Sequence, residues 1–231
     1  NRVLGYVLPA SGRFAHMALE PWALLNLFGD DFDEIVVVIY NQEILPFSRG
    51  MHQVASEVVR FVETDQELIM LMGHYDADPT IVGALRIQIQ SASALLVDFW
   101  RYIRAGRPLR HLTLPSALEE RATEFFNDIG VTPHDRVVAL HLREGGYLAG
   151  QRYHSFRNMS STNYELAVRH LLDQGNWVFR LGDRKSTPMT IDHPRFIDLP
   201  FLPNYEDFMD VVLLAKARFV IGCASGPEGP A

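Results

Sequence analysis

The residues best suited to chemistry follow one apolar run in the second half of the chain. Residues 137–140 are apolar and lead directly into His141, Arg143 and Glu144, with Gly145 next. An apolar strand that runs into polar side chains and glycines is the usual way in which α/β proteins build a ligand site. We therefore expect ligand binding at the end of this strand.

Arginine at such a position suits a phosphorylated ligand. Its guanidinium stays charged and offers a planar fork to phosphate oxygens. Arg143 is the first candidate, and Arg152 and Arg157 follow it in the loop. The alternative is structural, because an arginine after a strand often forms an ion pair, for example with Glu144. His141 likewise has two interpretations, as a ligand contact or as a core histidine that donates to a carbonyl.

Two later strands are expected to end at the same edge of the sheet. Arg180 and Asp183 close the strand predicted over 177–181, and Ser225 and Gly226 follow the strand predicted over 219–222. The carboxyl ends of parallel strands meet at one edge, so these residues should lie near Arg143. One interpretation of Arg180 and Asp183 is contact with the same ligand. The alternative is a structural pair between the two.

The first half offers a candidate base. His16 follows a strand predicted over 3–8, and Glu20 lies one helical turn further on the same face. A histidine or a carboxylate can act as a general base that takes the proton of a reacting hydroxyl group. The competing interpretation of His16 is a capping or surface histidine. His74, Asp76 and Asp78 resemble a metal cluster by type, but their position before Pro79 favours a solvated loop, and we predict no metal.

Bulk composition narrows the class of protein. The 231 residues are 48% hydrophobic with a net charge of -7, which favours a globular protein and disfavours nucleic acid as a partner. The single cysteine excludes an intramolecular disulfide and suits a cytoplasmic protein. No apolar run is long enough for a transmembrane helix. Peripheral association with the inner face of the membrane and the oligomeric state are left open.

Strand and helix patterns alternate along the chain, which predicts an α/β fold with two Rossmann-like lobes and parallel sheets. Gly106 and Pro108 within an arginine-rich stretch indicate a hinge, so we expect lobes over 1–105 and 117–231 joined by a linker over 106–116, with a cleft between them. The chain ends soon after a predicted strand, so a truncated C-terminal lobe is expected. Further strands are predicted over 35–40, 136–141 and 196–199, and helices over 16–28, 51–60, 66–72, 83–102, 116–128, 163–174 and 205–217.

These residues together resemble a bacterial family of glycosyltransferases associated with surface-polysaccharide synthesis. More remotely, the His-x-Arg pattern is similar to fucosyltransferases of the GT-B class. The resemblance covers mainly 117–231, whereas the first half matches loosely through its opening strand and the segment 16–20. It is carried by His141-Leu142-Arg143-Glu144, Tyr147, Arg157-Asn158, Tyr164, Arg180-Leu181-Gly182-Asp183, Asp198 and Ser225-Gly226.

The resemblance implies a GT-B-like, metal-independent enzyme without a cofactor. It would transfer a sugar from a nucleotide-sugar donor, a GDP- or UDP-sugar, to a glycan or lipid-linked acceptor. Catalysis would fall to His16, Glu20 and Arg143. Substrate binding would involve His141, Glu144, Tyr147, Arg152, Arg157, Asn158, Arg180, Asp183, Ser225 and Gly226.

Two other functions fit the same residues. A two-lobed protein of this kind could hold a nucleotide or sugar phosphate without turnover, or it could be an epimerase that isomerises a nucleotide sugar without an acceptor. A binder would show saturable binding and no product, which separates it from both enzymes.

Overall fold

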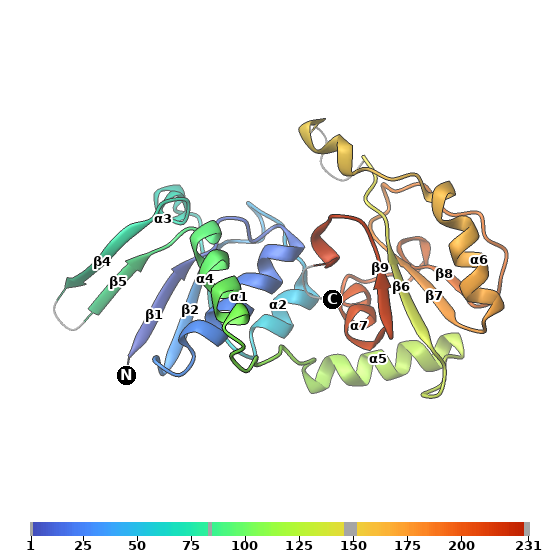
Figure 1. Ribbon diagram of the computed structural model, residues 1–231, viewed down its shortest axis with the longest axis horizontal. Helices are drawn as coiled ribbons and strands as arrows, with labels where there is room; N and C mark the ends of the chain where they lie inside the picture. The colour runs from blue at the N-terminus through green and yellow to red at the C-terminus, as the bar shows by residue number, and fades with distance from the viewer. Residues whose placement is uncertain (1, 83–84, 146–151, 229–231) are drawn as a thin grey trace. The chain divides into compact units, whose positions relative to one another are not determined.

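The computed structural model of the chain describes residues 2–82, 85–145 and 152–228. It divides into two compact units, Asn1–Pro115 and Ser116–Ala231. Residues 106–115, expected as part of a linker, group with the first unit. Each unit contains a parallel sheet with helices packed on it (Figure 1), which confirms the predicted α/β class.

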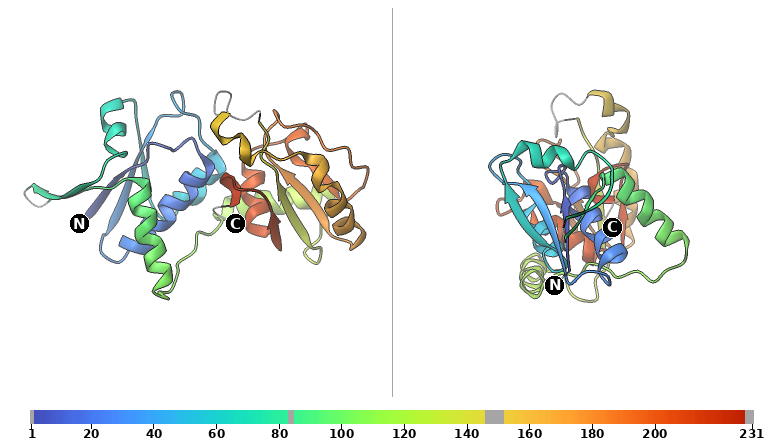
Figure 2. Two further views of the ribbon diagram at one scale, coloured as in Figure 1. Left: turned by 45° about the horizontal axis from the view of Figure 1, so that its top comes forward. Right: turned by 90° about the vertical axis from the view of Figure 1, so that its left-hand side faces the viewer.

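The first unit is built on a three-stranded parallel sheet in the order β1-β2-β3. Val7 of β1 pairs with Val38 of β2, which pairs in turn with Val62 of β3. Helix α1 packs against α2 and α4, and both views of Figure 2 show α1 and α4 side by side. The elements are β1 (Val3–Val7), α1 (Phe14–Phe28), β2 (Glu34–Tyr40), α2 (Arg49–Ala55), β3 (Arg60–Thr64), α3 (Glu67–Met72), β4 (Ala77–Val82), β5 (Leu85–Ile89) and α4 (Ala92–Arg104).

The stretch predicted as one helix over 83–102 is different in the structure. β5 pairs antiparallel with β4, and the helix starts only at Ala92. The side chain of Ser91 caps this helix by accepting a hydrogen bond from the Ala94 amide. Alternating apolar residues at Leu85, Ile87 and Ile89 have the period of a strand, and this local signal decides the conformation.

The second unit contains a four-stranded parallel sheet in the order β8-β7-β6-β9. The two central strands, β6 and β7, are buried over their whole length, and Leu140 pairs with Arg180. The elements are α5 (Ser116–Ile129), β6 (Val137–His141), η1 (Arg152–Arg157), η2 (Ser161–Tyr164), α6 (Glu165–Asp173), β7 (Trp177–Leu181), β8 (Phe196–Asp198), η3 (Leu199–Phe201), α7 (Phe208–Lys216), β9 (Phe219–Ile221) and η4 (Gly226–Glu228).

Helices cover both faces of this second sheet. Val168 and Leu172 of α6 join Val138 and Val178 in one core cluster. Phe179, which points to the opposite face because side chains alternate along a strand, meets the rings of Phe125 and Phe126 from α5. The strands are therefore held between apolar layers, and only their ends reach polar surroundings.

Glycines follow the ends of two helices of the second unit. Gly130 and Gly175 follow α5 and α6 with φ angles of 88° and 78°. This left-handed region is open to glycine and strained for other residues. Both helix ends lie where the sequence predicts them.

No helix among the described residues combines the length and the hydropathy required to cross a membrane.

Candidate functional site

The carboxyl edge of the second sheet brings several predicted site residues together. β6 pairs in parallel with β7 on one side and with β9 on the other, so their carboxyl ends lie at one edge. His141, Arg143 and Glu144 come from the first of these strand ends. Tyr147 lies outside the described residues, and Arg152 begins the short helix η1.

Arg143 is anchored by its backbone and by one side-chain nitrogen. Its amide donates to Sγ of Cys223 at 3.1 Å, and its carbonyl accepts from the Met159 amide at 2.8 Å. Nε donates to Oδ1 of Asn158 at 3.2 Å. No ion pair between described residues involves Arg143. The guanidinium is therefore held in place at the strand end, and no carboxylate of a described residue pairs with it.

Arg157 and Asn158 complete what we call the Arg143 cluster (Arg143, Arg157 and Asn158). Nη1 of Arg157 donates to the Ala224 carbonyl at 3.4 Å, and its Nε is buried without a hydrogen bond to any described residue. A Cβ on Gly145 would lie 3.2 Å from Nδ2 of Asn158, so this glycine lets the loop pass closely. The cluster combines two guanidinium groups and an amide.

Arg180 has surroundings unlike those of Arg143. Its side chain is fully buried, with 0% exposed, and Nη1 donates to the Thr187 carbonyl at 2.6 Å. Nη1 also lies 3.2 Å from Oδ2 of Asp198, and Nη2 lies 3.3 Å from Oε1 of Glu144. A guanidinium without exposed surface, shared between two carboxylates, is not placed to meet a phosphate. This geometry favours the structural interpretation of Arg180 over its predicted direct contact with a ligand.

Glu144 and Asp198 extend this network to the loop after β7. The second carboxylate oxygen of Glu144 accepts from the Thr187 amide at 2.6 Å, and Asp198 accepts from the Met189 amide at 2.8 Å. Burial raises the pKa of Asp198, although the Met189 amide and Arg180 act in the opposite direction. Together the two carboxylates and Arg180 fix the loop against the sheet.

His141 is an uncharged polar group at the same edge. It is 8% exposed, and Nδ1 has no hydrogen-bond partner among the described residues. Burial, followed by the positive charges of Arg180 and Arg143, lowers the pKa of His141 to about 4. The imidazole is therefore neutral at pH 7.

Asp183 and Ser225 occupy tight local turns. Oδ1 of Asp183 accepts from the Lys185 amide at 2.7 Å, an arrangement typical of an aspartate turn. Among the described residues, the carboxylates that pair with Arg180 are those of Glu144 and Asp198, and no ion pair joins Arg180 to Asp183. Ser225 directly precedes η4, the three-residue 3-10 helix that Gly226 opens.

In the first unit, the structure brings His16 and Glu20 into direct contact. Nδ1 of His16 lies 2.5 Å from Oε1 of Glu20, whose side chain is fully buried, while the His16 side chain is 28% exposed. Tyr6 of β1 donates to the other carboxylate oxygen at 2.5 Å. Burial and then the charge of Glu20 raise the pKa of Tyr6.

Tyr6 is a residue that the sequence interpretation missed. Its buried position on β1, between the buried residues Leu4 and Leu8, places its hydroxyl under α1, and strand alternation was the available signal.

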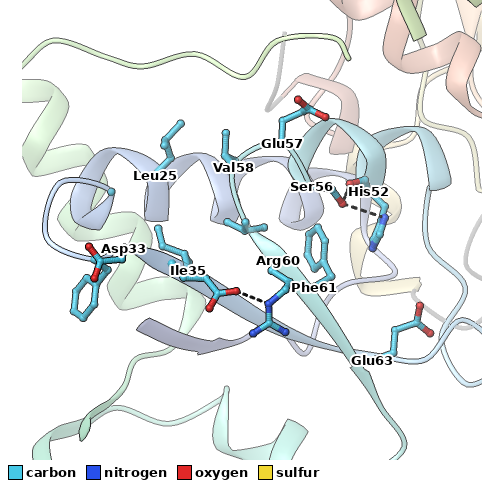
Figure 3. Close-up of a pocket in the computed structure, with 14 residues that line it drawn as sticks. Leu25, Asp33, Ile35, His52, Ser56, Glu57, Val58, Arg60, Phe61 and Glu63 are labelled. Atoms are coloured by element: carbon cyan, nitrogen blue, oxygen red, sulfur yellow. Dashed lines mark hydrogen bonds and ion pairs between the residues drawn. The ribbon is translucent and has the colours of Figure 1, made fainter. Parts of the chain in front are cut away.

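A hollow of about 610 Å³ lies elsewhere in the first unit (Figure 3). Glu34 and Arg60, its ion-paired residues, are the first residues of β2 and β3. The hollow is therefore near the amino ends of these strands, whereas His16 follows the carboxyl end of β1. Carboxylates of Asp33, Glu57 and Glu63 also line it, and this negative lining opposes an anionic nucleotide.

The described residues contain no group of three or more His, Cys, Asp or Glu side chains placed to hold a metal ion. Asp76, from the cluster considered in the sequence, instead accepts from the Ser91 amide and hydroxyl at 2.7 and 3.1 Å. It ties the segment after α3 to the start of α4.

Comparison with known proteins bears on the fold. The chain is similar to the solved structure of ADP-heptose LPS heptosyltransferase II from E. coli, with a TM-score of 0.59 and 12% sequence identity. The match covers 98% of this chain and 80% of that chain. The likeness establishes a GT-B-like α/β fold. No protein-family model and no curated protein matches the chain.

Proposed function

We propose that the protein is a metal-independent glycosyltransferase that moves a sugar from a nucleotide-sugar donor to a glycan or lipid-linked acceptor. The Arg143 cluster is the observation that carries the proposal. It offers two guanidinium groups at the carboxyl edge of a parallel sheet, where α/β folds bind ligands. The similarity to a solved heptosyltransferase that is named for an ADP-linked sugar supports the same class of substrate.

The Arg143 cluster suits the leaving group of such a reaction. When the bond between the anomeric carbon and the diphosphate oxygen breaks, the nucleoside diphosphate gains negative charge. A preorganised guanidinium stabilises that charge in the transition state. Arg143 takes this role and Arg157 assists, while neutral His141 at the same edge offers a hydrogen bond without further charge.

The His16 and Glu20 pair suits the acceptor side of the reaction. With a proton on Nδ1 directed to Glu20, Nε2 of His16 carries the lone pair that takes the proton of the attacking hydroxyl. Glu20 orients the ring and stabilises the imidazolium that forms, and Tyr6 holds Glu20. The acceptor oxygen then bonds to the anomeric carbon as the diphosphate leaves.

Nucleotide binding tests the donor site. UDP, GDP, CMP and ADP are added to the wild-type protein, to Arg143→Ala and to Arg169→Ala, and the midpoint of thermal unfolding is followed. Arg169 is an exposed arginine on α6 and serves as the matched control. We expect one nucleotide to stabilise the wild type and the control, by about 2.7 kcal/mol at a hundred times its Kd, and Arg143→Ala to lose this effect.

Turnover of a labelled nucleotide sugar tests the reaction. Transfer of label to an acceptor supports a transferase, isomerisation without acceptor indicates an epimerase, and binding without product indicates a non-catalytic protein. Absence of any nucleotide binding by the wild type contradicts the transferase and the epimerase, and leaves only a protein that binds a sugar phosphate.

A further inference from the structure

Tyr205 links the turn after β7 to the first turn of α7. Its hydroxyl oxygen lies 3.3 Å from the Gly182 carbonyl oxygen and 2.9 Å from Oδ2 of Asp210. Gly182 has a φ of 144°, and the next residue is Asp183, a proposed donor-site residue. The contact therefore joins the position of α7 to a turn at the edge that carries the Arg143 cluster.

Whether both hydrogen bonds of Tyr205 can form depends on the protonation state of Asp210. A phenol has one proton to donate, whereas a carbonyl and an ionised carboxylate both accept. With Asp210 ionised, Tyr205 can satisfy only one of them fully. With Asp210 protonated, the carboxylic acid donates to Tyr205, which donates to Gly182, and both bonds form.

The surroundings of Asp210 favour the protonated form. Its Oδ1 is buried without a hydrogen bond from any described residue, and an ionised carboxylate there would lack the solvation it needs. The pKa of Asp210 is raised to about 7, chiefly by burial. The hydrogen bond from Tyr205 acts in the opposite direction, and the negative charges of Asp207 and Asp183 add to the effect of burial.

The ion pairs that join described residues of α5 to the α7 region do not involve Asp210. α7 packs against α5 and β6. On the α5 side, Arg121 pairs with Glu206, and Lys216 pairs with Glu119. On β6, His141 is neutral because its pKa is lowered to about 4. The charges that act on Asp210 are thus the two neighbouring aspartates.

We propose that Asp210 and Tyr205 are positioning residues whose hydrogen-bond chain, complete only when Asp210 carries a proton, fixes the Gly182–Asp183 turn for donor binding. Loss of the proton as the pH rises breaks one bond of the chain and loosens the turn. The affinity for a nucleoside diphosphate then falls. This regulation rests on the proposed donor site, whereas the proton-dependent contact is independent of it.

Urea unfolding between pH 5 and pH 8.5 tests the contact itself. In Asp210→Asn, the amide donates to Tyr205 at every pH and imitates the protonated acid. Because the pKa of Asp210 is raised in the folded state, its stabilisation is present at low pH and lost as pH rises. The unfolding equilibrium constant of the wild type, divided by that of Asp210→Asn, should rise about tenfold per pH unit from pH 5 toward pH 7 and then level off.

Asp173→Asn, an exposed carboxylate at the end of α6, is the matched control and should not change the pH profile of the wild type. A flat ratio between wild type and Asp210→Asn across this range overturns the proposal.

Calorimetric titration with UDP or GDP at pH 6 and pH 8 tests the link to the donor site. From pH 6 to pH 8, the Kd of the wild type should rise at least about fivefold more than the Kd of Asp210→Asn. A fivefold change is the lower end of ordinary coupling between two sites. Tyr205→Phe should bind weakly at both values of pH. Equal pH dependence in wild type and Asp210→Asn overturns the positioning role. If neither the wild type nor any variant binds a nucleotide, but the ratio of unfolding constants still rises with pH, the proposed function is wrong and the proton-dependent contact is supported.

Discussion

Arg143 and Arg180 lie at the ends of neighbouring strands, and burial separates their roles. Arg180 is fully enclosed and shared between Glu144 and Asp198, whereas Arg143 forms no ion pair with a described residue. A guanidinium in the first setting holds the protein together, and one in the second is available to an anion. The two side chains should therefore respond differently to substitution.

We expect Arg180→Met to lower the free energy of unfolding by about 3–5 kcal/mol, because it leaves two partly buried carboxylates unpaired. Arg143→Ala should change it by less than about 1 kcal/mol and abolish nucleotide binding. Urea unfolding of both variants measures the difference. Equal losses of stability in the two would contradict the assignment.

The base is a second feature at the residue scale. Replacing His16 by Gln should reduce kcat by about 10²- to 10⁴-fold while the KM for the donor stays close to that of the wild type. Tyr6→Phe, which removes one hydrogen bond to Glu20 and leaves the imidazole in place, should have a smaller effect. Steady-state transfer assays with varied donor give both constants. A rise in the donor KM with unchanged kcat would place His16 in binding instead.

At the scale of elements, local patterns predicted most strands and helices, and the exceptions have physical causes. β3 was missed because its residues are largely exposed and do not alternate between apolar and polar, so only its pairing with β2 marks it as a strand. The strand β5 was hidden inside an expected helix, although its apolar residues alternate with a period of two. The central strands β6 and β7 were found easily because continuous apolar runs are typical of buried parallel strands.

Glycine at the end of α5 gives a prediction at this scale. Gly130→Ala should lower the free energy of unfolding by about 1 kcal/mol, because alanine must adopt a φ of 88° there. Gly5→Ala is the control, since a Cβ at either glycine meets no atom within 4 Å and only Gly130 of the two has a positive φ. Urea unfolding that shows the same loss in both variants would exclude backbone strain as the cause.

On the scale of the whole molecule, a net charge of -7 coexists with the two guanidinium groups of the Arg143 cluster, which we propose as the site of an anionic ligand. If the proposal holds, the overall charge repels the nucleotide at long range, whereas the Arg143 cluster attracts it within a few ångströms. Salt screens the first interaction more than the second, because the Debye length is about 8 Å at physiological ionic strength.

Raised ionic strength screens the attraction of the nucleotide to Arg143 and Arg157, but it also screens the repulsion from the net negative charge. We therefore expect it to weaken nucleotide binding less than it would in a protein without that repulsion. The expected change is less than about tenfold in Kd between 0.05 and 0.5 M NaCl, measured by titration calorimetry. Arg169→Ala provides the reference for a distant charge. A larger loss of affinity would mean that exposed charges, and not the anchored guanidinium of Arg143, supply most of the binding.

The sequence by itself determined the α/β class, the buried central strands and the edge at which Arg143, Glu144 and Arg180 gather, since apolar periodicity and strand direction are local properties. Only the tertiary structure decided which of these side chains is enclosed. Enclosure depends on residues distant in the chain, such as Thr187 and Asp198 around Arg180. The same holds for Tyr6 beneath Glu20 and for Tyr205 between Gly182 and Asp210, because a hydrogen bond across the fold leaves no periodic trace in the sequence.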